Sequence, residues 1–287
     1  MHWTEQRRAF RKILETPRCV FPASIFDPIS ARIAEDIGFE VGMMAGSVAS
    51  MTVLGAPDLT VLTLSEFADQ AYRICRAGKL PLMVDADHGY GNALNVKRTV
   101  EELEAAGVAA LSIEDTLLPQ PFGTSEAQQL ISIEEGVGKM RAAIAGRQDP
   151  DLVIVARSSA IQIAGIEAAV ERACAYQSAG VDVLHFAGIK TRAELDAVSA
   201  ATTLPIVVGN SWQDTDDLDY LAERRVRVCQ RGHRPLMAAI QAVYETMQGL
   251  RDGAASSAMP KAASPELVRQ LTRQDDFDRW TKDFLGT

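Results

Sequence analysis

The sequence has few cysteines and no long apolar run. Its four cysteines are scattered singly among 287 residues, so the Cys-x-x-Cys spacing of a zinc knuckle or a dithiol redox motif is missing. Every apolar run falls short of the ~20 residues that a membrane-spanning helix needs. The first residues, MHWTEQRRAFRKIL, are charged and contain no apolar signal core. We therefore expect a cytoplasmic protein with reduced thiols and no membrane partner.

Positive charge is also scarce. The chain has 29 lysines and arginines against 38 aspartates and glutamates, which gives a net charge of −9. A nucleic-acid partner is excluded on this ground, because binding the phosphate backbone needs a basic face. A small anionic substrate would be repelled by the field of the whole protein, so it would need a local cation in its site.

A complete dinucleotide fingerprint is missing, because GYGNAL supplies only the first two glycines of G-x-G-x-x-G. Short apolar runs alternate with helical periods through most of the chain. The runs cover residues 19–27, 39–47, 80–87, 108–115, 152–159, 181–188, 204–210 and 226–232. Eight such alternations predict an α/β fold, a (β/α)8 TIM-type barrel, in preference to a doubly wound open sheet.

The C-terminal region has a different composition. We expect the catalytic barrel to span residues 1–252 and a flexible linker, rich in Gly, Ser, Ala and Pro, to span 253–264. Residues 265–287 return to helical spacing, with apolar residues at Leu267, Leu271, Phe277, Trp280 and Phe284. This C-terminal helical arm is expected either to pack on another subunit or to fold back on its own barrel.

Carboxylates gather where the predicted strands end. Asp85 and Asp87 follow the third run in VDADHGYG, Glu114 ends the fourth, and Asp58 follows the second. Strand ends meet at one face of a barrel, where the carboxylates would repel one another unless a hard cation such as Mg²⁺ joined them. We expect Asp85 to bind the metal directly, Asp87 and Glu114 to bind it through water, and Asp58 to be a further candidate. The alternative is that these side chains only cap helices.

Three more polar residues stand at strand ends, namely Ser47, Arg157 and His233. Arg157 closes the apolar run LVIVAR, so its buried cation needs a partner, either a nearby carboxylate or a substrate carboxylate gripped by the guanidinium fork. His185 lies within its strand and is interpreted as a hydrogen-bonded core histidine, and the helical Cys174 as core. The loop GNSWQDTDD is acidic, which disfavours a phosphorylated substrate.

These motifs resemble the isocitrate lyase and phosphoenolpyruvate mutase superfamily. The resemblance rests on FDPISARIAEDIGF, GSVAS, DADHGYGNALNV, SIEDTLLPQPFG, EEGVGKMRAA, VARSS and RGHRPLMAAI. The LSIEDTLLPQPFG motif and the GH near the eighth run narrow it to the oxaloacetate decarboxylase family. The resemblance implies a (β/α)8 barrel that uses Mg²⁺, with Mn²⁺ as a substitute, and oligomers that exchange a C-terminal helix. It also implies that Asp85 binds the metal, while Ser47, Arg157 and His233 contact the substrate.

The resemblance implies a carboxy-lyase that converts oxaloacetate, a small dicarboxylic 2-oxo acid, to pyruvate and CO₂, assembled as a homodimer or homotetramer. Lyase members of the superfamily carry a Cys-Gly-His lid, whereas TLLPQPFGTSEAQQL has neither Cys nor His. Ser158-Ser159 also depart from the Thr-Asp or Thr-Asn usual after the arginine. The alternatives are a lyase or hydrolase acting on another 2-oxo acid or a phosphonate, or a non-catalytic metabolite-binding barrel.

Overall fold

A computed structural model describes residues 3–124, 128–209, 216–255 and 258–286. Its eight strands form one parallel sheet in the order of the chain, each strand paired with the next. The strands are β1 (Ala23–Ser24), β2 (Gly42–Met44), β3 (Leu82–Asp85), β4 (Ala110–Glu114), β5 (Val153–Ser158), β6 (Val183–Phe186), β7 (Ile206–Val208) and β8 (Val226–Cys229). Each lies inside one of the predicted apolar runs, and the predicted TIM-type fold is confirmed.

The ring of strands closes through Val20, three residues before β1. Val20 forms a parallel bridge with Val228 of β8. Its amide donates to the Arg227 carbonyl at 2.9 Å, and its own carbonyl accepts from the Cys229 amide at 2.9 Å. The carboxyl ends of the strands therefore meet at one mouth of a barrel.

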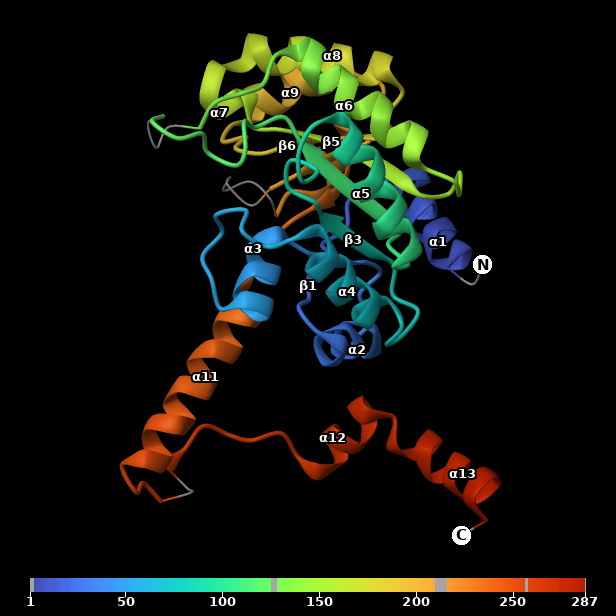
Figure 1. Cartoon of the computed structure of the whole chain (residues 1–287), viewed down its shortest axis with the longest axis vertical. Helices are drawn as coiled ribbons and strands as arrows, with labels where there is room; N and C mark the ends of the chain where they lie inside the picture. Colours follow the sequence, from blue (N-terminus) through green and yellow to red (C-terminus); the bar gives the residue numbers. More distant parts are fainter. Residues whose placement is uncertain (1–2, 125–127, 210–215, 256–257, 287) are drawn as a thin grey trace.

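Helices surround the strands, except for the last three, which extend away from the barrel (Figure 1). They are α1 (Thr4–Glu15), α2 (Pro28–Asp36), α3 (Gly46–Ala49), the π-helical turn η1 (Ser50–Leu54), α4 (Leu64–Cys75), α5 (Ala93–Ala105), α6 (Ile133–Gly146), α7 (Ala160–Ala164), α8 (Ile166–Ala179), α9 (Arg192–Ala200), α10 (Leu218–Glu223), α11 (Arg234–Arg251), α12 (Pro265–Thr272) and α13 (Gln274–Leu285). None of these helices is both long and apolar enough to span a bilayer.

Strand residues alternate between two cores, as the pleat requires. Side chains such as Val84 and Ile154 point outward and pack under the helices. Met83, Val155 and Val183 point inward and share the barrel interior with Phe10 of α1. Two residues further along each of these strands, the inward-pointing side chains are polar, and they form a polar floor at the carboxyl ends of the strands.

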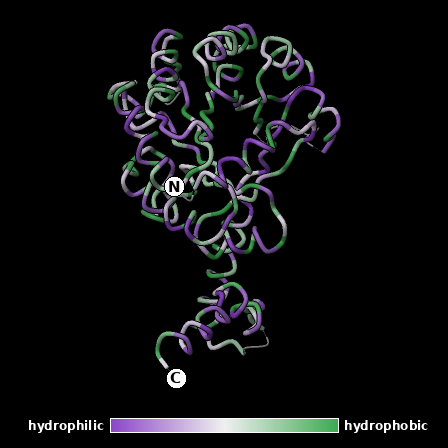
Figure 2. Tube along the Cα trace, turned by 90° about the vertical axis from the view of Figure 1, so that its right-hand side faces the viewer, coloured by the Kyte–Doolittle hydropathy of each residue, from purple (hydrophilic) through white to green (hydrophobic). Residues whose placement is uncertain are grey.

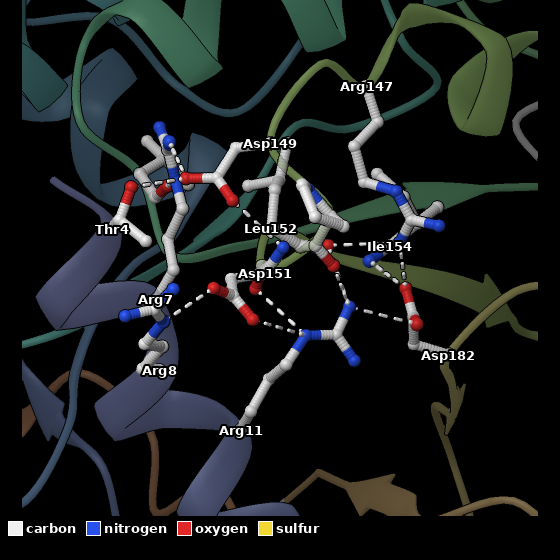
Figure 3. Close-up of polar contacts among 12 residues, drawn as sticks. Thr4, Arg7, Arg8, Arg11, Arg147, Asp149, Asp151, Leu152, Ile154 and Asp182 are labelled. Atoms are coloured by element: carbon white, nitrogen blue, oxygen red, sulfur yellow. Dashed lines mark hydrogen bonds and ion pairs between the residues drawn. The ribbon is translucent and has the colours of Figure 1, made fainter. Parts of the chain in front are cut away.

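Helix α1 covers the opposite end of the barrel and is held there by charged groups (Figure 3). The buried Arg7 donates to Asp149 at 2.7 Å and to the Val108 carbonyl at 3.1 Å. Arg11 and Arg147 both reach Asp182, at 3.1 and 2.7 Å. Because partners satisfy the charges within this network, it is a structural closure, distant from the strand ends where the polar floor lies.

The predicted burial of one helical residue is wrong. Cys174 was expected in the core, but it is exposed. The buried face of α8 runs through Ala169, Arg172, Ala173 and Tyr176. One residue adds about 100° around a helix, so Cys174, directly after Ala173, turns out of this face.

Most of the C-terminal part of the chain extends away from the barrel (Figures 1 and 2). α11 extends outward, and the single helix expected beyond the linker is two, α12 and α13, separated at Arg273, whose φ is +58°. α12 contacts α2 of its own barrel, because Arg273 donates to both oxygens of Asp36 at 2.7 and 2.8 Å. α13 has no buried residue.

Candidate active site

A cavity of about 570 Å³ opens at the carboxyl ends of the strands. All the site residues expected from the sequence line it, namely Ser47, Asp58, Asp85, Asp87, Glu114, Arg157 and His233. The side chains at the ends of β3, β4 and β5 that point into the barrel are Asp85, Glu114 and Arg157. Because successive strand residues alternate between the two faces, these three side chains point toward a common space. Asp87 follows β3, Asp58 is exposed at the cavity mouth, and Ser47 lies in α3.

Arg157 is the cation at the centre of these carboxylates. Its Nη1 forms an ion pair with Asp85 and lies 3.4 Å from Oε2 of Glu114. This is the carboxylate partner that the sequence had left as one of two alternatives. The Nε of Arg157 has no hydrogen-bond partner among the residues described, so one edge of the fork remains unused. The guanidinium is therefore tied to the acidic cluster without being saturated by it.

Asp85 differs from its acidic neighbours in its ionisation. Burial alone would raise the pKa of Asp85, but the Arg157 charge and hydrogen bonds from Arg157 and Ser112 bring that pKa below its usual value. Ser112 donates to Oδ1 of Asp85 at 3.0 Å. Asp85 is thus kept as an anion and is well suited to bind a cation.

Asp87 and Glu114 have raised pKa values. Burial, followed by the charges of Asp85, Asp58 and Glu114, raises the pKa of Asp87 to about 8. Burial is also the main reason that the pKa of Glu114 rises to about 7, although Arg157 opposes it. More negative charge is gathered here than one arginine can neutralise, which is the condition that a bound divalent cation would relieve.

The donor atoms of this cluster are carboxylate oxygens, which hard divalent cations prefer. Across residues 3–124, 128–209, 216–255 and 258–286, no three His, Cys, Asp or Glu side chains come close enough together to hold one ion between them.

His233 stands on the other side of the cavity, between β8 and α11. Its Nδ1 lies 2.9 Å from Oγ of Ser24 in β1, which fixes the orientation of the ring. Burial lowers the pKa of His233, while the Asp85 and Asp58 charges oppose that shift. A neutral imidazole with one nitrogen engaged keeps the other available for a molecule in the cavity.

His185 also lines the cavity, although its position within β6 had suggested a core histidine. It is paired in register with Arg157, and its Nδ1 has no partner within the part of the chain that the structure describes. Burial and the neighbouring Arg157 lower the pKa of His185 to about 3, which keeps the ring neutral. The available signal was the spacing: His185 is two residues after Val183 and therefore shares its inward row.

Asp115 does not belong to the site. It accepts from Arg172 at 2.9 Å and from the Tyr176 hydroxyl at 2.8 Å, on the helix side of the barrel wall. Residues 210–215 of the acidic loop and 125–127 of the segment after β4 lie outside the described residues. Gln120 and Gln128, which flank the latter, line the cavity with neutral amides.

A parallel barrel whose carboxylates, arginine and histidines meet at the carboxyl ends of its strands defines the class of α/β-barrel enzymes. The chain belongs to the phosphoenolpyruvate phosphomutase family, whose model matches residues 10–251. The resemblance to this superfamily drawn from the sequence motifs is thereby confirmed.

The relatives extend the match to the C-terminal arm. An oxaloacetate decarboxylase from Rhodopseudomonas palustris (strain BisA53) is 56% identical over 286 residues, which cover 100% of this chain and 99% of that protein. Oxaloacetate acetylhydrolase in complex with 3,3-difluorooxalacetate has a TM-score of 0.86 and 28% identity, covering 98% of this chain and 97% of that one. Phosphonopyruvate hydrolase with oxalate and Mg²⁺ has a TM-score of 0.86 and 29% identity, covering 98% and 99%.

Proposed function

We propose that this chain is a carboxy-lyase that decarboxylates oxaloacetate to pyruvate and CO₂ with the aid of a divalent cation. The observation that carries the proposal is the cavity in which Asp85, Arg157 and His233 face a common space. Full-length identity of 56% to a protein named oxaloacetate decarboxylase supports the choice of reaction. The complexes of two related folds with difluorooxalacetate and with oxalate support a small dicarboxylate as the ligand.

Mg²⁺ is the proposed cation, with Mn²⁺ as a substitute. Asp85 would hold it directly, Asp87 and Glu114 would hold its water ligands, and Asp58 would reach it from the mouth. When bound, the cation supplies Lewis acidity toward the 2-oxo group. The raised pKa values of Asp87 and Glu114 support this assignment, because a cation would favour their charged forms.

Some of the cavity residues would bind the substrate, and others would take part in the reaction. Arg157, whose side chain is partly open to the cavity, would grip a substrate carboxylate with its guanidinium, and Ser47 would donate to the same end. In the reaction the C3–C4 bond breaks, CO₂ leaves, and the electron pair moves to the oxygen of an enolate. His233, oriented by Ser24, would hydrogen-bond this developing charge or the departing carboxylate. A proton then adds at C3 to give pyruvate.

A hydrolase acting on a phosphonate is the second candidate, since phosphonopyruvate hydrolase shares the fold. The cavity lining favours the decarboxylase, because the amides of Gln120 and Gln128 add no cation for a phosphonate and the segment TLLPQPFGTSEAQQL lacks the cysteine of the lyase lid. An assay panel of 2-oxo acids and phosphonopyruvate separates the candidates. A non-catalytic barrel would convert none of them.

The deciding experiment measures pyruvate formation from oxaloacetate above the background caused by free metal. Purified protein with Mg²⁺ is expected to exceed that background, and EDTA is expected to abolish the difference. Asp85→Ala should approach the background, while Asp115→Asn serves as the control, because Asp115 points away from the cavity. Full activity of Asp85→Ala would refute the metal assignment.

We further propose that the barrel, residues 1–252, assembles as a homodimer or homotetramer through the linker (253–264) and the arm (265–287). The outer face of α11 supports this, because its apolar side chains are exposed: Met237, Ile240, Val243, Tyr244, Met247 and Leu250. An apolar groove beside α2, lined by Phe26, Ile33 and Ile37, offers a complementary surface on a second copy. α12 would remain on its own barrel through Asp36.

A further inference from the structure

The turn that follows β3 is held by hydrogen bonds to four successive carbonyls. The carbonyl oxygens of Ala86, Asp87, His88 and Gly89 accept, in that order, from the Gly89 amide at 2.9 Å, the Glu114 amide at 2.8 Å, Nζ of Lys139 at 3.0 Å and Oγ1 of Thr99 at 3.0 Å. Each donor after the first comes from a different element, namely β4, α6 and α5. Each of these carbonyls thus has its own donor, and three of the donors lie outside the turn.

The backbone needs this support, because Asp87 has a φ of +47° and Tyr90 a φ of +61°. Side chains other than glycine adopt such angles only where the surroundings impose them. The imposed geometry matters at Asp87, whose carboxylate fits closely against Gly46. A Cβ added at Gly46 would lie 2.8 Å from Cγ of Asp87, so a small rotation of the turn would move this carboxylate out of its place.

Lys139 is the one charged donor among the four. It is 3% exposed, and its bond to the His88 carbonyl is its single hydrogen bond within the described residues. The acidic groups that face it are Glu135 on its own helix and Glu114 and Asp115 at the end of β4. Burying a charged ammonium is unfavourable unless opposite charges or hydrogen bonds compensate for the lost water. Lys139 is nevertheless buried, next to the acidic cluster.

We infer that Lys139 is a positioning residue of the acidic site, which fixes the direction of Asp87 through the His88 carbonyl without touching substrate or cation. The inference rests on the proposed cation site and deepens it. A charged donor makes a stronger hydrogen bond than a neutral one, and it acts one residue from Asp87. Its charge also offsets part of the repulsion at Glu114. The acidic cluster therefore has two cations, Arg157 in front and Lys139 behind.

The test compares Lys139→Met with Thr99→Val. Lys139→Met keeps an apolar stem of similar length but removes both the donor and the charge, whereas Thr99→Val removes a neutral donor to the same turn, one carbonyl further on. Binding of Mn²⁺, followed by electron paramagnetic resonance, should weaken by ~10–100-fold in Lys139→Met, the range found for groups that orient metal ligands. In Thr99→Val it should change by less than about threefold, because no charge is lost there.

A second measurement does not depend on any metal. Amide hydrogen exchange of Glu114, whose N–H donates to Asp87, should accelerate in metal-free Lys139→Met and stay close to wild type in Thr99→Val. If Lys139→Met does not fold, Lys139→Gln, which keeps a neutral donor, should show an intermediate loss in both measurements. Thermal melting shows which variants are folded.

Unchanged Glu114 exchange in the Lys139 variant would overturn the positioning role, and so would faster exchange with unchanged Mn²⁺ affinity. Equal losses in Thr99→Val and Lys139→Met would also overturn it, because the turn would then respond to any missing donor. A wild-type protein that binds no Mn²⁺ would instead refute the cation of the proposed function. In that case the exchange rates alone would decide the role of Lys139.

Discussion

The hydroxyl of Ser24 lies 2.9 Å from Nδ1 of His233, across the seam where the first and last strands of the barrel meet. The contact joins β1 to the residue that immediately precedes α11, so the closure of the barrel also orients a side chain of the cavity. His233 thereby presents its other nitrogen to the space shared with Asp85 and Arg157.

Ser24→Ala tests this relationship. The ring of His233 loses its partner and its fixed orientation, so kcat is expected to fall by roughly 3–10-fold, the worth of a hydrogen bond of about 1 kcal/mol. Steady-state kinetics with oxaloacetate measure the change. Ser178→Ala is the control, since among the described residues the Ser178 hydroxyl bonds only to the Cys174 carbonyl, on the surface of α8. Equal kinetics of Ser24→Ala and wild type would contradict a role for this contact in orienting His233.

Gly46→Ala tests how closely Asp87 is placed. The added methyl group would meet the Asp87 carboxylate and force it aside, so kcat/KM should fall by ~10²-fold, the scale of a 1 Å misplacement. Gly138→Ala on α6 is the matched control, because within the described part of the chain nothing lies within 4 Å of its added Cβ. It should raise stability by ~0.5–1 kcal/mol without changing activity. Similar kinetics in both variants would show that the position of Asp87 is not critical.

Much of this architecture can be predicted from the sequence, because parallel strands buried on both faces are short continuous apolar runs. Once a barrel is inferred, the position of Asp85, Glu114 and Arg157 at the strand ends follows without knowledge of contacts. The partner of Arg157 does not follow. Two carboxylates reach it from neighbouring rows of the barrel, and only the register and tilt of the strands decide which ones.

His185 shows a second limit of sequence reasoning. The sequence does not show whether an inward-pointing residue in the middle of a strand packs in the barrel core or lines a cavity. In β6 the level of Val183 is packed and the level of His185 opens into the cavity. The break at Arg273 shows in the sequence only as a six-residue interval between Leu271 and Phe277, where the helical repeat has three or four. It depends on contacts that the sequence does not display, including the bonds from Arg273 to Asp36.

The C-terminal arm is tested by truncation after Asp252. If α11, α12 and α13 form the contact between subunits, removing residues 253–287 should lower the oligomer mass or the melting temperature, because apolar side chains such as Phe277 and Trp280 lose their partner. Light scattering and thermal melting measure the two effects. Asp36→Ala is the control, since it removes the bonds between Arg273 and the barrel but keeps the arm. A truncated protein with unchanged mass and melting would show that the arm is only a tail.

The raised pKa of Asp87 predicts a pH dependence of stability. A carboxyl group with a pKa of about 8 in the folded state and about 4 when unfolded binds its proton more tightly in the folded protein. Its contribution to stability is therefore complete below pH 4 and is lost as the pH rises through 8. The melting temperature of the metal-free wild type should therefore fall between pH 5 and 8.5 more than that of Asp87→Asn, in which residue 87 has no titrating group.

Mg²⁺ should reverse this trend, because it binds the charged carboxylate and displaces the proton. The stabilisation of wild type by a fixed Mg²⁺ concentration should grow from pH 6 to 8.5, and it should grow less in Asp87→Asn. Parallel melting curves of the two proteins across this range, with and without Mg²⁺, would contradict the shifted pKa of Asp87.

Arg157 and His233 are expected to act on different kinetic constants. A substrate carboxylate is charged in both the ground state and the transition state, so Arg157 provides largely uniform binding. Arg157→Lys keeps the charge that neutralises Asp85 but loses the two-point fork, so KM should rise by ~10–100-fold, the worth of a hydrogen bond to a charged group. The value of kcat should change much less.

His233 meets charge that moves as CO₂ departs, so its hydrogen bond strengthens toward the transition state. His233→Ala should therefore lower kcat by ~10²–10³-fold while KM stays near wild type. His233→Gln, which keeps a donor at a similar distance, should recover part of kcat. If His233→Ala left kcat intact while Arg157→Lys destroyed it, the two roles would have to be exchanged. If neither variant changed either constant, the reaction would have to occur away from the cavity that Asp85, Arg157 and His233 line.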